Sequence, residues 1–231
     1  IKKTKRLPYD HGDLVKIFGA GTYTDGDRFL GGAGEAAVWL PVLALYTGAR
    51  LEELGQLLVA DVCNEHDIDY LSITDLNPES DTSQAEKRLK NAASRRNLPV
   101  HPELIRIGFL HYVERLRKAE EPRLFPELRP DCHGKVTGNW SKWWSRFRRK
   151  GLGITSRLKP FHSFRHTFRD ACRDAGLDEE VADALMGHAS SEKTGRRYGR
   201  GYSVAKLHEA ISKISYPGLV IPVIVEDEQP G

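Results

Sequence analysis

The stretch from residue 161 to residue 198 constrains the fold most, because it holds two amphipathic helical patterns with a clear break between them. Apolar residues recur at steps of three and four from Phe161 to Cys172, which is typical of a helix with one buried face. Gly176 is a common helix end, Asp178 a common helix start, and Gly187 ends the second pattern. The sequence therefore predicts two helices followed by a turn.

Four polar residues of this stretch are of kinds that bind phosphates or transfer protons. His162 and Arg165 are three residues apart, so they point to the same side of the first helix. His188 occupies the turn after the second helix, and Tyr198 stands among arginines ten residues later. This combination predicts a site that handles a phosphoryl group.

A fifth candidate, Arg50, follows a glycine in the segment TGARLEEL at residues 47–54. A helix is expected to begin near Arg50 and to bury its leucines at positions 51, 54, 57 and 58. The planar guanidinium of arginine can hold two oxygens of one phosphate. The alternative is a surface arginine paired with Glu52 or Glu53. Glu53 is interpreted as a brace for Arg50 or a neighbour rather than as a catalytic base.

The middle of the chain predicts a small antiparallel sheet. Residues 61–74 alternate enough for two short strands, and residues 87–100 predict a hairpin with its tip at 91–94. Lys90 lies beside this tip in a basic segment. Taken alone, Lys90 is a solvated hairpin lysine.

Further apolar patterns predict helices in the rest of the chain. Residues 13–18 predict a short helix, residues 35–46 an apolar one that Pro41 must kink or start, and residues 204–214 a last amphipathic one. The run LVIPVIV at residues 219–225 has a β-like composition.

Two more segments have a helical pattern of apolar residues, and in the second of them the aromatic residues have two possible roles. A helix opened by Pro102 is expected to bury Ile105, Phe109, Tyr112, Val113 and Leu116. Another helix carries Trp140, Trp143, Trp144 and Phe147 beside several arginines. Aromatic residues among arginines can stack on bases, but the helical spacing favours a core stripe.

The net charge is only +3, yet the charges are strongly sorted along the chain. Residues 51–81 contain nine acidic residues and no lysine or arginine, whereas residues 86–118 and 140–200 are rich in basic residues. Such sorting favours a basic face that meets a polyanion, although ordinary solvated helices are the alternative.

The spacing of the cysteines argues against a metal site, and the hydropathy argues against a membrane-spanning protein. The three cysteines are odd in number and widely spaced, which fits a reducing interior, and no paired spacing supports a metal site. No apolar run approaches the ~18 residues that a membrane span needs. The sequence also lacks a nucleotide-binding G-x-x-x-x-G-K-[ST] loop.

Taken together, these segments resemble the catalytic domain of the tyrosine recombinases, or phage integrase family. The matching landmarks are TGARLEEL, the hairpin KNAASRRNLPV, HSFRH, the pair Gly187-His188 and Tyr198. They occur in the family's order over roughly residues 35–205. The resemblance implies a mainly α-helical fold with a small antiparallel β-sheet at one edge. It also implies three parts: a linker and lead-in segment at residues 1–30 from a core-binding domain, the catalytic domain at 31–215, and a tail at 216–231.

The resemblance implies roles for the arginines and histidines. Arg50 and Arg165 resemble the two arginines that grip the scissile phosphate. His162 resembles the first histidine beside that phosphate, in a hydrogen-bonding or acid–base role. His188 resembles the second histidine, which orients or neutralises the phosphate.

The resemblance also implies a proton donor and a nucleophile. Lys90 resembles the hairpin lysine that protonates the leaving 5′ oxygen, and Lys87 is a lesser rival for that role. Tyr198 resembles the nucleophile that forms a 3′-phosphotyrosine. The ten positions from His188 to Tyr198 exceed the family's usual nine by one, which predicts a bulge near residues 193–195 and makes Tyr202 a rival nucleophile.

The function implied is site-specific recombination of DNA, in the integration or excision of a mobile genetic element. Double-stranded DNA is the expected partner, with a tetramer on paired sites, no metal, no small-molecule cofactor and no membrane. A bacterial or phage-encoded protein acting in the cytoplasm is expected. The alternatives are a degenerate module that binds DNA without cutting it, and a type IB topoisomerase-like enzyme that relaxes DNA.

Overall fold

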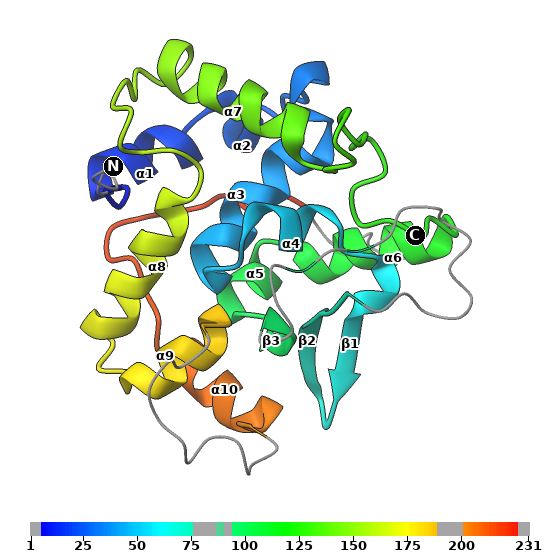
Figure 1. The fold of residues 1–231 in the computed structure, drawn as a ribbon, viewed down its shortest axis with the longest axis vertical. Coiled ribbons are helices and arrows are strands. Elements are labelled where there is room, and N and C mark those ends of the chain that lie inside the picture. Colours follow the sequence, from blue (N-terminus) through cyan, green and yellow to red (C-terminus); the bar gives the residue numbers. More distant parts are fainter. Residues whose placement is uncertain (1–5, 76–86, 88, 90–93, 189–200, 226–231) are drawn as a thin grey trace.

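The computed structural model describes residues 6–75, 87, 89, 94–188 and 201–225. Within these ranges the protein is mainly helical, with a three-stranded antiparallel sheet at its lower edge in Figure 1. This architecture confirms the predicted fold class. The helices are α1 (His11–Phe18), α2 (Gly21–Thr24), α3 (Glu35–Thr47), α4 (Leu51–Gly55), α5 (Pro102–Arg106), α6 (Phe109–Lys118), α7 (Gly138–Lys150), α8 (Ser163–Asp174), α9 (Glu179–Met186) and α10 (Val204–Ile211), with 3-10 turns η1 (Leu30–Gly32) and η2 (Val59–Asp61).

Helix α3 lies at the centre of the molecule, with α4, α5 and α8 around it (Figure 1). Every residue from Ala36 to Thr47 is buried, as expected of a helix that is apolar on all sides. Pro41 lies inside this helix, so it does not start it as one reading of the sequence allowed. The apolar side chains that α8 turns toward α3 include Phe164 and Phe168, both fully buried.

The sheet has the strand order β1 (Val62–Glu65), β2 (Ile68–Ile73) and β3 (Arg96–Pro99). The register places Leu71 opposite Leu98 and Ile73 opposite Arg96. Leu71, Ile73 and Leu98 are buried, and α10 packs against β2 and β3. Since side chains alternate along a strand, Arg96 shares the inward face with Leu98. A charged side chain therefore points into the molecule at the end of the sheet.

The prediction of one long helix after Pro102 is wrong, because Gly108 divides it into α5 and α6. Gly108 has a φ of +95°, and a Cβ there would lie 2.1 Å from the carbonyl oxygen of Val225. The backbone N–H of Ile224 donates to the carbonyl oxygen of Ile107 at 2.9 Å. The C-terminal segment thus occupies the place where a continuous helix would run, and Ile105 is 42% exposed rather than buried.

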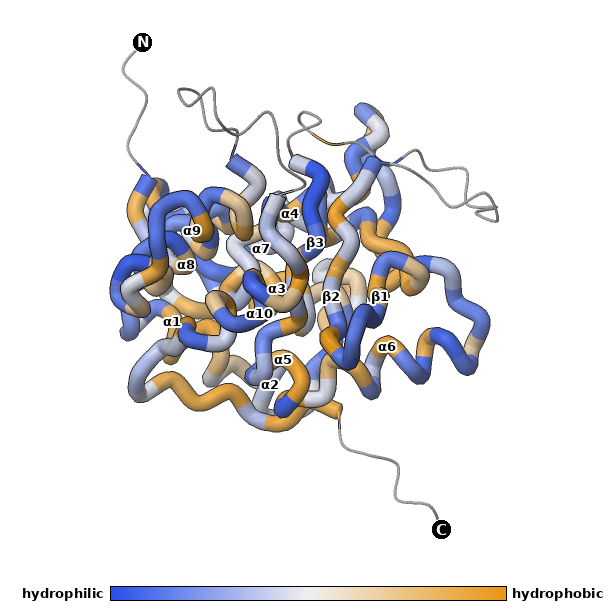
Figure 2. Tube along the Cα trace, turned by 90° about the horizontal axis from the view of Figure 1, so that it is seen from below, coloured by the Kyte–Doolittle hydropathy of each residue, from blue (hydrophilic) through white to orange (hydrophobic). Residues whose placement is uncertain are grey.

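Helix α6 illustrates the amphipathic character of the outer helices. Figure 2 shows hydrophobic and hydrophilic residues alternating along it. Its buried residues are Phe109, Tyr112 and Val113, and Tyr112 donates its hydroxyl hydrogen to the carbonyl oxygen of Leu124. In α7, Trp140 and Trp144 are buried and stack with centroids 5.6 Å apart, as a core stripe predicts, whereas Trp143 and Phe147 are only partly buried against the core.

The ends of the described chain join the same core. Leu14, Ile17 and Phe18 of α1 are buried, and so is Ile221 near the C-terminus. The β-like run at 219–225 forms no strand in the part of the chain that is described. The helix after Arg50 is shorter than expected and ends at Gly55, so the leucines at 57 and 58 are buried but lie beyond it. The division into residues 1–30, 31–215 and 216–231 stays a prediction.

Among the helices within the described ranges, none combines the length and the apolar character that crossing a membrane requires.

Candidate active site

Arg50 is placed by a tight turn between two helices. Gly48 ends α3 with a φ of +62°, and a Cβ there would lie 2.5 Å from the ring of Phe168. This close approach to α8 requires glycine. Arg50 is then the N-cap residue of α4, with 22% of its side chain exposed. The sequence-based expectation that Arg50 begins this helix is confirmed.

Glu53 is the brace that holds Arg50. Its Oε2 accepts the backbone N–H of Arg50 at 2.9 Å, and its Oε1 pairs with Arg50 Nη1. Arg50 Nη1 also donates to Ser94 Oγ at 3.2 Å, next to β3. Only 3% of the Glu53 side chain is exposed, and the neighbouring Arg96 and Arg50 hold the pKa of its carboxyl below its ordinary value against the opposing effect of burial. A buried, ionised Glu53 fixes Arg50 in one geometry.

Arg165 lies beside Arg50, because the Arg165 guanidinium reaches the turn at Gly48 that precedes Arg50. Nη1 donates to the carbonyl oxygen of Gly48 and Nη2 to that of Met186, both at 2.6 Å. The residue is 4% exposed. Burial and the charge of Arg50 lower the pKa of Arg165. These carbonyl partners carry no net charge, so an arriving anion would stabilise the cation.

His162 is the N-cap residue of α8, three residues before Arg165. Burial, aided by the charges of Arg6 and Arg165, lowers its pKa to about 4. The imidazole is therefore neutral at pH 7 and can accept a proton or donate one hydrogen bond. Its ring lies 5.4 Å from that of His166, measured between centroids.

His188 lies just beyond α9, where Gly187 ends the helix with a φ of +64°. Its Nδ1 is 3.2 Å from Asp183 Oδ1, and Arg169 Nη1 donates to the same oxygen at 2.7 Å. Because an ionised carboxylate only accepts, Nδ1 carries the hydrogen and Nε2 faces away from Asp183. Burial and the charge of Arg165 lower the pKa of His188.

The structure thus brings Arg50, His162, Arg165 and His188 together from three segments of the chain: the start of α4, the start of α8 and the end of α9. A cavity of about 240 Å³ opens beside the first two of these segments. Its lining includes Arg6, Ala49, Leu51, His162 and Arg165. The site is rich in cations, two neutral imidazoles lie in it, and Glu53 is the carboxylate that orders it. Such a set of groups can bind a phosphate and move protons beside it.

The other two predicted catalytic residues, Lys90 and Tyr198, lie outside the described residues, as does the predicted bulge near 193–195. Their rivals are described. Lys87 forms a 2.7 Å ion pair with Asp61, and only 3% of the Lys87 side chain is exposed. Tyr202 is 39% exposed just before α10. The buried ion pair of Lys87 favours a structural role for it.

Replacing Lys87 with Met is therefore expected to act on stability. The change leaves the buried Asp61 carboxylate without its cation, which should lower the free energy of unfolding by about 3–5 kcal/mol. Chemical denaturation followed by circular dichroism measures this. The matched control is Arg95→Met, which breaks an exposed pair with Asp75 (side chains 48% and 29% exposed) and should leave the free energy of unfolding nearly unchanged. A Lys87→Met variant that stays as stable as the wild type would contradict this structural role.

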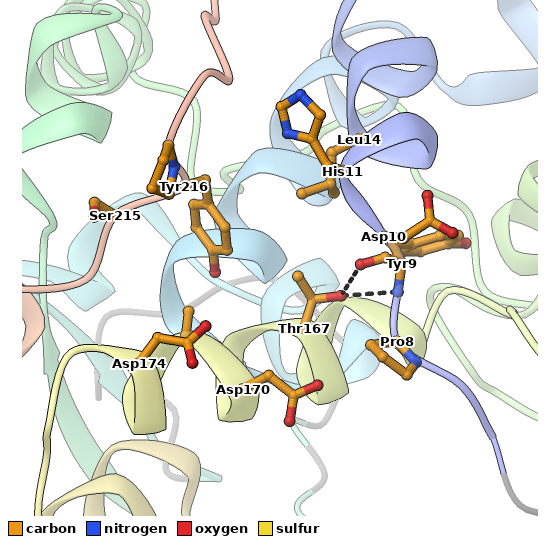
Figure 3. A pocket seen from close by; sticks show the side chains of 12 residues that line it. Pro8, Tyr9, Asp10, His11, Leu14, Thr167, Asp170, Asp174, Ser215 and Tyr216 are labelled. Atoms are coloured by element: carbon orange, nitrogen blue, oxygen red, sulfur yellow. Dashed lines mark hydrogen bonds between the residues drawn. The ribbon is translucent and has the colours of Figure 1, made fainter.

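A second cavity, of about 410 Å³, lies between α1, α8 and the segment after α10 (Figure 3). Thr167 lines it and exchanges hydrogen bonds with the backbone N–H (2.9 Å) and carbonyl (3.1 Å) of Tyr9. Asp170 and Asp174 stand on its wall, on a side of α8 turned away from Arg165. Its carboxylates would repel a polyanion, so this cavity is not part of the phosphate site. Nowhere in the described ranges do three or more metal-capable side chains gather in a group that could hold a metal ion.

Sequence reasoning missed two residues of the site. Asp183 orients His188, and Arg96 binds the second oxygen of Glu53. A signal for Arg96 was present, because it stands two residues before Leu98 on a strand and so shares its buried face. An arginine on a core face needs buried acceptors for its N–H groups, and a buried carboxylate such as Glu53 also compensates its charge.

Comparisons with known proteins agree with this geometry. The description "Phage integrase family" matches residues 39–203. The fold is similar to the Tn1549 transposon integrase in complex with transposon right-end DNA, with a TM-score of 0.54 and 16% identity over 90% of this chain and 66% of that one. It is also similar to the XerH site-specific recombinase bound to difH substrate, with a TM-score of 0.50 and 19% identity over 81% of this chain and 49% of that one. The chain thus spans about two thirds of the first and half of the second.

No curated protein matches the sequence. The family match, however, covers well over half of the chain. The chain belongs to the phage integrase family, the tyrosine recombinases, and residues 39–203 form its catalytic domain.

Proposed function

We propose that this chain is a site-specific recombinase that cleaves and rejoins double-stranded DNA through a phosphotyrosine bond, as part of a tetramer on paired sites. Its task is the integration or excision of a mobile genetic element. The solved relatives support this task, since one is a transposon integrase and both are bound to DNA. The six residues proposed to carry the chemistry are Arg50, Lys90, His162, Arg165, His188 and Tyr198.

The observation that carries the proposal is a pair of neighbouring arginines, of which one is bound by a carboxylate and the other by carbonyl oxygens. Arg50 is braced by the buried Glu53, while the buried Arg165 is held by two carbonyl oxygens. Burying a cation is costly unless an anion compensates it. A phosphodiester at this position would receive charge-assisted hydrogen bonds from both guanidinium groups. The position of the buried Arg165 next to Arg50 therefore supports binding of a phosphate.

The proposed reaction is an in-line displacement at phosphorus. The hydroxyl oxygen of Tyr198 forms a bond to phosphorus, and the bond from phosphorus to the 5′ oxygen breaks. Lys90 gives a proton to the 5′ oxygen, and His162, neutral at pH 7 because its pKa is about 4, accepts the phenol proton. Arg50 and Arg165 stabilise the negative charge on the equatorial oxygens, and His188 donates to one of them through Nε2 once it is protonated beside the phosphate. Reversal with a different 5′ hydroxyl rejoins the strands without an external energy source.

Covalent capture tests the proposal without knowledge of the target site. The protein is incubated with a labelled library of random-sequence duplexes, each nicked near its middle so that a short 5′-hydroxyl fragment diffuses away after cleavage. We expect a protein–DNA adduct that survives denaturant and is removed by protease, and the captured DNA can be sequenced. Binding to the library without any such adduct would refute the enzyme and leave a DNA-binding module.

Acidification is expected to weaken the free protein and to strengthen its binding to DNA. The pKa values of His162, His166 and His188 lie below their ordinary 6.5, so the unfolded chain binds more protons between pH 6.5 and about 4. Stability therefore falls as the pH falls through this window. A DNA phosphate favours the charged imidazoles, so affinity rises over the same window.

Thermal melting and fluorescence anisotropy with a labelled duplex, each followed across that pH window, check both trends. Replacing His162 with Gln removes the group whose pKa is lowered to about 4, so it should flatten both pH dependences. Affinity that decreases on acidification would contradict a phosphate site at these histidines.

A further inference from the structure

One buried arginine that has no role in the proposed reaction touches several parts of the site. Arg96 begins β3, and only 6% of its side chain is exposed. Its Nη2 pairs with Glu53 Oε2 at 2.9 Å, so Glu53 lies between Arg96 and Arg50. Arg96 itself lies too deep to meet a DNA phosphate.

The remaining nitrogens of Arg96 bind two other segments. Nε donates to the carbonyl oxygen of Leu185 in α9 at 2.8 Å, and Nη1 donates to that of Ser94 at 2.7 Å. The next carbonyl along α9, that of Met186, accepts from Arg165. One planar group therefore joins the brace of Arg50, the end of the hairpin segment and the helix end that precedes His188.

Gly187 supplies an independent observation. A Cβ at this position would lie 2.6 Å from Arg96 Nη1 and 3.0 Å from its Cζ. The helix end is thus packed directly on the guanidinium, and glycine is needed both for this contact and for the positive φ. The glycine before His188 and the arginine of β3 form one packed unit.

We propose that Arg96 is a positioning residue that acts through Glu53 to set the Arg50 guanidinium and through the end of α9 to set His188. Lysine cannot replace it, because a single ammonium lacks the fork that reaches three acceptors in different directions. The expected effect of Arg96 on the reaction rate rests on the proposed function. Its expected effect on the order of the Arg50 side chain does not.

The experiment compares Arg96→Lys with the neighbouring control Arg95→Lys, whose parent side chain is exposed and pairs with Asp75. A displacement of about 1 Å in a catalytic group can cost about 10²-fold in rate. We therefore expect Arg96→Lys to lower the rate of adduct formation at saturating nicked DNA by about 10²-fold, with little change in DNA affinity or its salt dependence. Arg95→Lys should leave the rate unchanged. An equal effect of the two variants, or a loss confined to affinity, would overturn the proposal.

A double-mutant cycle separates positioning from a general loss of structure. If Arg96 acts through Glu53, then Glu53→Gln and Arg96→Lys together should lower the rate little more than either change alone. Fully additive losses would show that the two residues act independently and would overturn the proposal.

A third measurement does not depend on DNA cleavage. The ¹⁵N relaxation of the Arg50 Nε–Hε group, recorded without DNA, should show a more mobile side chain in Arg96→Lys than in the wild type or in Arg95→Lys. Unchanged relaxation would overturn the proposal, even if the wild type forms adducts. Conversely, a mobile Arg50 in a protein that forms no adduct would support the positioning role while the proposed function fails.

Discussion

Replacing Tyr198 with Phe is expected to abolish the covalent protein–DNA adduct and to leave DNA binding intact. Phenylalanine lacks the oxygen that, in the proposed reaction, forms the new bond to phosphorus. We expect the rate of adduct formation to fall by at least about 10⁴-fold, as for the loss of a nucleophile in other enzymes. Denaturing gel electrophoresis of labelled nicked DNA measures the adduct, and anisotropy measures the binding.

Tyr202→Phe is the matched control. It removes the same hydroxyl oxygen from a tyrosine that lies four residues further along the chain and is 39% exposed. It should form the adduct at nearly the wild-type rate. If Tyr202→Phe is inactive and Tyr198→Phe is active, the nucleophile has been assigned to the wrong tyrosine. Loss of the adduct in both variants would point to a requirement for the local structure of the segment rather than for one hydroxyl.

Local patterns in the sequence predicted the helices that carry the site. The apolar steps from Phe161 to Cys172 correspond to α8, and Asp178 and Gly187 bound α9 as expected. These features are encoded within a few neighbouring residues, through periodicity and backbone conformation. The prediction of one helix after Pro102 was wrong because the break in it depends on a long-range contact. Its break at Gly108 is packed against Val225, more than a hundred residues away.

The candidate site shows the same division between local and long-range information. Glu53 lies one helical turn from Arg50, and its role as a brace could be predicted from that spacing. The second partner of Glu53, Arg96, is 43 residues away and depends on how β3 packs against α4 and α9. Lys87 was a rival for the proton donor in the sequence, but it pairs with Asp61 inside the protein. Identity and spacing reveal candidate residues, whereas burial decides which charges remain available to a ligand.

The charges of the candidate site suit the proposed binding of a DNA phosphate. Arg165 and Arg50 place two cations side by side, and their mutual repulsion, together with burial, lowers the pKa of Arg165. Burial, together with the charges of Arg6 and Arg165, lowers the pKa of His162 to about 4 and so keeps it neutral at pH 7. A phosphodiester would relieve this repulsion as it binds, and the further negative charge that develops on its oxygens would be stabilised more strongly still. The site is thus more complementary to a charged transition state than to a neutral ligand.

The largest loss after that of the nucleophile is expected for Arg165→Ala. This change removes a buried guanidinium that is held in place by the carbonyl oxygens of Gly48 and Met186. Arginines that stabilise phosphoryl transition states contribute about 10³–10⁵-fold in rate, so adduct formation at saturating DNA should fall by that factor. Arg173→Ala is the control, because it removes the same charge from the same helix at a side chain that is 66% exposed. Arg173→Ala should change the rate by less than about twofold. It should lower the affinity for DNA only slightly, because the charge that is lost lies far from the site. Melting temperatures of both variants show whether each is folded. If Arg165→Ala loses no more activity than Arg173→Ala, the buried arginine contributes nothing to the transition state, and the chemistry must be sought elsewhere on the protein.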